Sequence, residues 1–234
     1  LIASKTSGFK DPIFNQSFLM VFHHVISFYN NEIPLLRAPI TEDEQLENYV
    51  SPLSDGCLSA YRYEIEDTII DQKDSVFVVS FYPKKGKNFN SLKGRLFINN
   101  NGFALQSIIA EPNEKGLIEF RFHQEYKLQN GRWFPSVLNE EIGFTQMIIN
   151  KKIRVYPVYQ ITSVIDSVKY QVDGMRQNLN IEKLYIDKIA LKTSNETLNK
   201  ARPIGLNPRE NKPYQRMDSL GGAIGLDNKI AFFK

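Results

Sequence analysis

The chain has 234 residues, which suits one large domain or a domain with an appended segment. A hydrophobic fraction of 42% and a charged fraction of 24% are ordinary for a globular protein, while 16 Phe and 11 Tyr favour strands. The net charge of +3 is small and the basic residues are scattered, which argues against a nucleic-acid-binding protein.

The first strong pattern predicts a helix over residues 12–29, with Asp11 as N-cap and Pro12 at the first helical position. Its apolar side chains recur at spacings of three and four residues, at Phe14, Phe18, Val21, Phe22, Val25, Ile26 and Tyr29. Apolar residues also occupy the other faces, so most of the helix surface must be covered. Residues 37–56 are polar and predict a loop, with a short helical turn near 42–46.

From residue 57 onward the apolar period changes from helical to alternating. The predicted strands cover 61–66, 75–82, 93–98, 103–110, 117–128, 133–144 and a final pair within 144–149 and 153–172. Asn101-Gly102 and Asn130-Gly131 lie between such runs and predict hairpin turns, and the basic cluster at residues 84–87 suits an exposed hairpin tip. About eight strands joined by short turns predict an antiparallel sheet.

The last part of the chain differs from the sheet region. Pro203, Pro208 and Pro213 interrupt it, and three glycines follow. We therefore expect a connector with short helical turns and no strands over 201–234, after a domain that spans 1–200.

The residue constellations that carry catalysis or bind metals are missing from the sequence. His23 and His24 are adjacent on the predicted helix and cannot easily share a metal, while His123 alternates outward on a strand. The single cysteine, Cys57, is expected to be a buried structural residue. The carboxylate pairs Glu64/Glu66 and Glu140-Glu141 suit the exposed face of a strand better than an acid/base pair. We therefore expect no catalytic residue, no metal, no cofactor and no enzyme.

Several segments point to one family: residues 6–14, 80–89 (Ser-Phe-Tyr-Pro-Lys-Lys-Gly-Lys-Asn-Phe), 92–99, 109–112, Trp133-Phe134-Pro135 and, in the tail, 201–206 with Tyr214 and 217–221. They resemble a Bacteroidetes outer-membrane family of unknown function. The tail departs from the family shortly before Arg202, where Leu198 or Asn199 stands in place of an expected tryptophan. The resemblance implies a carboxypeptidase-regulatory-like domain, then this region, then an outer-membrane barrel, and hence a periplasmic fragment of a longer chain. It implies no catalytic residues.

A second, weaker resemblance is to the lipoprotein-carrier fold, through the strand, Asn-Gly turn and Gly131-Arg132-Trp133-Phe134-Pro135 segment. That fold implies a half-barrel with an apolar concave face and helices across its opening. Together with the patterns above, it predicts an α+β fold in which the apolar N-terminal helix lies against the concave face of a strongly curved antiparallel sheet.

The leading hypothesis for function is a non-catalytic periplasmic binding or accessory module that holds a lipid acyl chain or an apolar segment. The predicted binding groove is lined by Phe14, Phe18, Phe22, Phe77, Val79, Phe81, Leu96, Ile98, Phe120 and Phe122. Its helix is either a permanent part of the core or a lid hinged at Gly8 and Asn30-Asn31. The alternatives are a structural spacer or protein-interaction module, and third a hydrolase with an unrecognised carboxylate pair.

Overall fold

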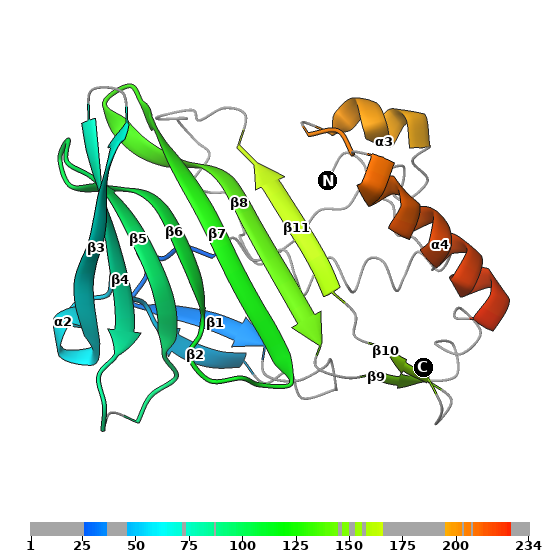
Figure 1. The fold of residues 1–234 in the computed structure, drawn as a ribbon, viewed down its shortest axis with the longest axis horizontal. Coiled ribbons are helices and arrows are strands. Elements are labelled where there is room, and N and C mark those ends of the chain that lie inside the picture. The colour runs from blue at the N-terminus through cyan, green and yellow to red at the C-terminus, as the bar shows by residue number, and fades with distance from the viewer. Residues whose placement is uncertain are drawn as a thin grey trace, which may run out of the picture. The chain divides into compact units, whose positions relative to one another are not determined.

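Seven antiparallel strands form the main sheet of the computed structural model (Figure 1). The structure describes residues 26–36, 46–71, 74–86, 88–144, 147–149, 153–155, 158–165, 195–202, 204–206 and 208–225. The chain divides into two units, one formed by 26–170 and the other by 1–25 with 171–234. The domain boundary predicted at residue 200 stays a prediction.

The main sheet runs in the order β11-β8-β7-β6-β5-β4-β3, so each strand from β3 to β8 lies beside the next one in the chain. Its strands are β3 (Tyr61–Asp71), β4 (Asp74–Pro83), β5 (Leu92–Asn99), β6 (Ala104–Pro112), β7 (Ile118–Gln129), β8 (Arg132–Phe144) and β11 (Val158–Val164). Every pair is antiparallel, which confirms the predicted antiparallel sheet.

Both predicted Asn-Gly hairpins form. Asn130 and Gly131 connect β7 to β8 and have φ values of 51° and 76°, which is the left-handed pair that a two-residue type I′ turn requires. Between β5 and β6, Gly102 and Phe103 have φ values of 76° and 52°. The strand predicted to begin at Phe103 therefore begins one residue later, because the turn takes this exposed side chain. In the hairpin tip after β4, Lys84 and Lys85 are exposed.

A separate two-stranded sheet was missed by the sequence analysis. β1 (Glu32–Leu36) pairs antiparallel with β2 (Leu46–Val50). β2 lies within residues 37–56, for which a loop was predicted. The prediction failed because β2 is formed through its partner: β1 buries Ile33 and Leu35, and such tertiary pairing outweighs a weak local pattern. Backbone bonds from Val50 to Asn90 and from Ser51 to Asn31 tie this hairpin to its surroundings.

The predicted N-terminal helix lies mostly outside the described residues, which begin at residue 26. Its predicted end at Tyr29 is wrong, because residues 28–31 form a turn and bends. The backbone oxygens of Ile26 and Phe28 accept hydrogen bonds from the side chains of Gln124 and Ser51, respectively. These two carbonyls are engaged by side chains of the sheet unit.

The strands predicted after residue 144 form two pairings. β9 (Met147–Ile149) and β10 (Ile153–Val155) make a small antiparallel sheet, whereas β11 pairs with β8 at the edge of the main sheet. A short helix, α2 (Cys57–Ala60), precedes β3 and buries none of its residues. Cys57 is therefore only half-buried, which corrects the prediction of a buried cysteine.

The described residues of the tail form two helices, α3 (Asn195–Ala201) and α4 (Pro208–Ile224). The prediction of a tail without strands holds for the described residues from 201 to 225, but α4 is longer than the short turns expected. Pro208 was expected to interrupt the chain, yet at the first helical position its missing N–H costs nothing. Pro213 lies inside the helix.

Candidate functional site

The strand register sorts the side chains of the main sheet onto two faces. Residues paired directly across two antiparallel strands point to the same side, and successive residues alternate. Phe77 is paired with Ile98, and Val79 with Leu96. The same side of the sheet continues across β6, β7 and β8, where it is occupied by Ile108, Gln124 and Leu138, respectively. We call this side the apolar face; it is formed by Phe77, Val79, Phe81, Leu96, Ile98, Ile108, Phe120, Phe122, Leu138 and Ile142.

All of the predicted groove residues on the sheet lie on this apolar face. Phe81, Leu96, Phe120 and Phe122 are buried. The other three, Phe77, Val79 and Ile98, are half-buried. The three predicted from the N-terminal helix, Phe14, Phe18 and Phe22, lie outside the described residues.

Residues just before β1 cover part of the apolar face. Phe28 is fully buried and meets Phe122 edge to face, with ring centroids 5.9 Å apart. The Nε2 of Gln124 donates a 2.8 Å hydrogen bond to the backbone oxygen of Ile26. The hydroxyl of Tyr126 donates to Oε1 of Gln124 at 3.1 Å, so both ends of this amide are bonded. A buried polar side chain that is satisfied in this way fixes the covering segment in one position.

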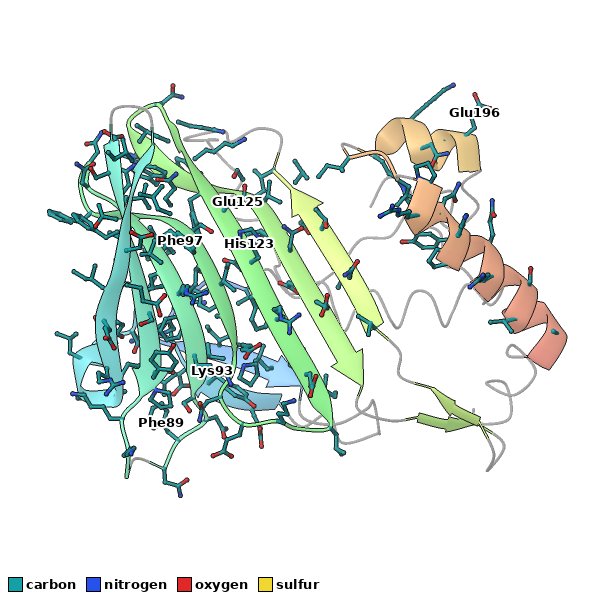
Figure 2. The ribbon with its side chains drawn as sticks, in the orientation of Figure 1. Phe89, Lys93, Phe97, His123, Glu125 and Glu196 are labelled. Atoms are coloured by element: carbon teal, nitrogen blue, oxygen red, sulfur yellow. The ribbon has the colours of Figure 1, made fainter. Side chains whose placement is uncertain are left out.

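A second cluster of aromatic side chains is centred on Tyr61, at the beginning of β3. Its ring meets Phe81 and Phe89 edge to face, at centroid distances of 5.8 and 5.7 Å (Figure 2 labels Phe89). The Tyr61 hydroxyl donates to the backbone oxygen of Val50 at 2.6 Å and accepts from the amide of Leu92 at 3.0 Å. Burial raises the pKa of Tyr61 to about 12. This hydroxyl joins the β1–β2 hairpin to the main sheet.

The β3 side of the apolar face remains open. Ile65 is paired with Val79 and is 67% exposed, and Ile70 on the same strand is 80% exposed. A bulge lies between Ile65 and Asp67, so Ile69 points to the opposite side, next to Val76. Isolated exposed isoleucines are common, but here they continue a buried apolar surface to the solvent.

Glu140 places a carboxyl group on the apolar face. Its register partners are Phe122 on β7 and Ile161 on β11, and the residue is only 9% exposed. No described residue donates a hydrogen bond to its carboxylate or forms an ion pair with it. Burial raises the pKa of the Glu140 carboxyl from its ordinary value of 4.5 to about 7. Desolvation penalises a charge that has no partner, and the group therefore holds its proton to higher pH.

The opposite side of the sheet carries a row of charges across the strands, which we call the polar face. Lys93 lies 3.4 Å from Glu111, Glu111 lies 3.7 Å from Arg121, and Arg121 lies 3.2 Å from Glu141. Gln160 completes the row with a 3.0 Å bond to Glu141. Towards the other end of this side, Val76 and Val78 are buried.

A shallow depression of about 280 Å³ lies on β7, β8 and β11. It is lined by Arg121, His123, Asn139, Glu140, Glu141, Gln160, Ile161 and Thr162. Its polar groups already bind one another: Thr162 donates to Asn139 at 2.8 Å, and Arg121 and Gln160 share Glu141. These bonds leave few free donors and acceptors on the polar-face side of the depression, and the side chain of Glu140 points to the other face of the sheet.

The carboxylates considered as acid/base pairs have different surroundings. Glu140 and Glu141 are successive on β8 and therefore point to opposite faces, and Glu140 is buried rather than exposed as the sequence suggested. Glu66 is held by Arg95 at 2.6 Å, while Glu64 is exposed. Alternation on β8 left the choice of face open, and it is the pairing with β7 that places Glu140 beside Phe122.

The histidine on the sheet behaves as predicted. His123 lies on the polar face of β7, with Nε2 3.6 Å from Glu125 (Figure 2). Within the described ranges, no group of three or more His, Cys, Asp or Glu side chains could hold a metal ion. None of the helices in these ranges is both long and apolar enough to cross a membrane.

Two polar residues of the apolar face, Gln124 and Glu140, were not predicted to lie there from the sequence. The alternating pattern of β7 contained the signal for Gln124, because it occupies the inward position between Phe122 and Tyr126. The signal for Glu140 was weaker, since it depends on the register with β7.

Comparison with known proteins supports the first resemblance at a coarser level. The model of a family of unknown function, DUF5686, matches residues 1–162. The tail segments that contributed to the resemblance lie beyond this match. No curated protein and no solved structure matches the chain. The match covers more than half of the 234 residues, and the chain therefore belongs to the DUF5686 family of unknown function.

Proposed function

We propose that the sheet domain is a non-catalytic binding module that holds an acyl chain or an apolar segment on its apolar face. The observation that carries this proposal is the continuity of that face. Buried side chains such as Leu96 and Phe122 continue into half-buried Phe77, Val79 and Ile98 and end at exposed Ile65. A sheet face that served only as core would be covered throughout, whereas this one offers apolar contacts at the solvent boundary.

The proposal includes a curved half-barrel with the 12–29 segment as its cover. Support comes from the place where the described chain begins: Ile26 is bonded to Gln124, and Phe28 packs on Phe122. In the proposal, the segment before Ile26 is an apolar helix that lies against this face and either stays in place or opens to admit a ligand.

Phe18→Ala distinguishes these two versions of the cover. If the helix is permanent core, the substitution lowers the free energy of unfolding by about 3–5 kcal/mol. A mobile lid predicts a smaller loss together with stronger binding of an apolar dye. A variant with unchanged stability and unchanged dye binding would contradict both versions.

We further propose a periplasmic location, as a module of an outer-membrane protein whose barrel is the partner in the same chain. The resemblance of residues 80–89 and 92–99 to the outer-membrane family supports this location. Fractionation of cells that express the native full-length protein tests it, and recovery of the protein in the cytoplasm would contradict it.

Native mass spectrometry of the purified chain tests the binding proposal. We expect mass additions that correspond to a lipid and disappear after delipidation, followed by rebinding of a defined phospholipid or fatty acid. A chain that purifies without any addition and rebinds no lipid would favour the alternative of a structural spacer.

A protein-interaction module remains the second candidate function. The observation that favours it is the position of β3, an eleven-residue edge strand with Ile69 45% exposed and Ile70 80% exposed. Exposed edge strands can accept a strand from a partner chain. Backbone amide exchange on β3 that slows in the presence of the rest of the full-length protein, but not with lipid, would favour this candidate.

A further inference from the structure

We propose that Glu140 is the head-group site of the apolar face and selects an amphiphile with an ammonium group. This inference rests on the proposed function, because it needs an apolar chain to occupy the same face. It names the chemical class of the ligand: an alkyl or acyl chain that ends in, or carries, a positively charged hydrogen-bond donor.

Glu140 offers acceptor oxygens, and the described side chains around it offer no hydrogen-bond donor. On its own strand it lies between Leu138 and Ile142, which are both buried, and its partners across the strands are Phe122 and Ile161. Glu140 is 9% exposed as a residue, and no described residue donates a hydrogen bond to its carboxylate. Among these apolar side chains the charged carboxylate is poorly hydrated, so a ligand cation is a favourable partner.

The polar neighbours on this face do not provide that partner. The Tyr126 hydroxyl donates its only proton to Gln124, and the Gln124 amide donates to the backbone of Ile26. The row of cations formed by Lys93, Arg95 and Arg121 lies on the other side of the sheet, where each is paired with a glutamate. None of the described side chains therefore offers Glu140 a donor, and in the proposal a bound ligand supplies it.

An ammonium group fits this site better than the other head groups of an apolar ligand. A carboxylate would place a second negative charge or a second acceptor beside Glu140, and the two would repel. A hydroxyl offers one neutral donor, whereas an ammonium offers three donors and the opposite charge. A metal ion would need further ligands, and no such group occurs among the described residues.

The test compares decylammonium, decanol and decanoate, below their micelle concentrations, by calorimetric titration of the full chain at pH 8.5. At this pH the amine is charged and the carboxyl of Glu140 has lost its proton. We expect wild type to bind decylammonium about tenfold more tightly than decanol, the size of one charge-assisted hydrogen bond. Glu140→Gln should abolish this preference, whereas Glu141→Gln, the same change one residue away on the polar face, should keep it.

A titration of wild type with decylammonium from pH 6 to pH 8.5 gives an independent measurement that needs no variant. Its affinity should rise with pH as Glu140 ionises. The other described titratable groups that share this face, Tyr29, Tyr61, Tyr63 and Tyr126, stay neutral in this range because burial raises the pKa of each.

The outcomes separate the two proposals. Equal binding of all three compounds, a preference that survives in Glu140→Gln, or one that is lost equally in Glu141→Gln would overturn the role of Glu140 and leave the apolar binding face intact. No binding of any of the three compounds would overturn the binding function, and the inference with it.

Discussion

The two faces of the main sheet satisfy their polar groups in different ways. On the polar face, charges such as Arg121 and Glu141 pair with each other across strands and stay in contact with water. The apolar face holds Gln124, which is bonded at both ends, and Glu140, which has no partner among the described residues. Neighbouring positions on one strand, such as Arg121 and Phe122 or Glu140 and Glu141, therefore differ in how much their side chains contribute to stability.

The largest effect is expected for Phe122→Ala, compared with Arg121→Ala beside it on β7. Phe122 is fully buried against Phe28, so its truncation should lower the free energy of unfolding by about 3–5 kcal/mol. Arg121 is exposed and its ion pairs are screened by water, so its loss should cost no more than about 0.5–1 kcal/mol. Urea denaturation measures both, and equal costs would break the distinction between the faces.

Glu140→Gln should change the pH dependence of stability. The folded state raises the pKa of this carboxyl from 4.5 to about 7. Below pH 4.5 the carboxyl is protonated in both the folded and the unfolded state, and it does not destabilise the fold. Between pH 4.5 and 7 stability is lost as the buried group ionises, by about 3 kcal/mol in total. The glutamine variant lacks this loss, and it should therefore be more stable than wild type at pH 8 but similar at pH 4.5.

Glu141→Gln is the matched control for that measurement. Its carboxylate lies on the polar face, 3.2 Å from Arg121, and its replacement should not stabilise the protein at pH 8. Thermal unfolding of wild type and both variants from pH 4.5 to pH 8 gives the comparison. An equal pH dependence in wild type and Glu140→Gln would place Glu140 in water, contrary to the account.

Gln124→Ala should have an intermediate effect. It leaves the backbone oxygen of Ile26 without its donor and the Tyr126 hydroxyl without its acceptor, at a cost of about 1–3 kcal/mol. Gln160→Ala, which removes an exposed glutamine bonded to Glu141, is the control and should be nearly neutral. Hydrogen exchange at residues 28–35 should accelerate in the first variant alone.

The smallest effect is expected for Ser107→Ala. The hydroxyl of Ser107 is buried and lacks a hydrogen-bond partner within the described part of the chain. Its removal therefore deletes no bond and should leave the free energy of unfolding unchanged or raise it by up to about 1 kcal/mol. A clear loss of stability in denaturant would mean that the hydroxyl has a partner.

The strands and hairpin turns of the main sheet could be predicted because short stretches of sequence determine them. Alternation fixed which residues share a face, as with Phe77 and Val79, and Asn130-Gly131 fixed the β7–β8 hairpin. Structures that depend on distant partners could not be found in this way. The strand at 46–50 exists through pairing with β1, and the inward position of Glu140 follows from its register with Phe122.

The outcome for the predicted groove residues also depends on which signals are local. Strand alternation identified its seven sheet residues correctly as neighbours on one face. Residues 26–28, which cover this face, were assigned to a helix because their apolar spacing fits one. Their carbonyls instead accept side-chain hydrogen bonds from Gln124 and Ser51, which no periodicity encodes.

The binding of an apolar fluorescent probe to two isoleucine variants tests the central claim most directly. Ile65 and Ile69 lie on the same strand and are both exposed, but the bulge between them places Ile65 on the apolar face and Ile69 on the other. Titration with N-phenyl-1-naphthylamine should show a several-fold weaker affinity for Ile65→Lys and an unchanged affinity for Ile69→Lys. Equal affinities in wild type and both variants, or a loss confined to Ile69→Lys, would contradict an apolar face that binds ligands.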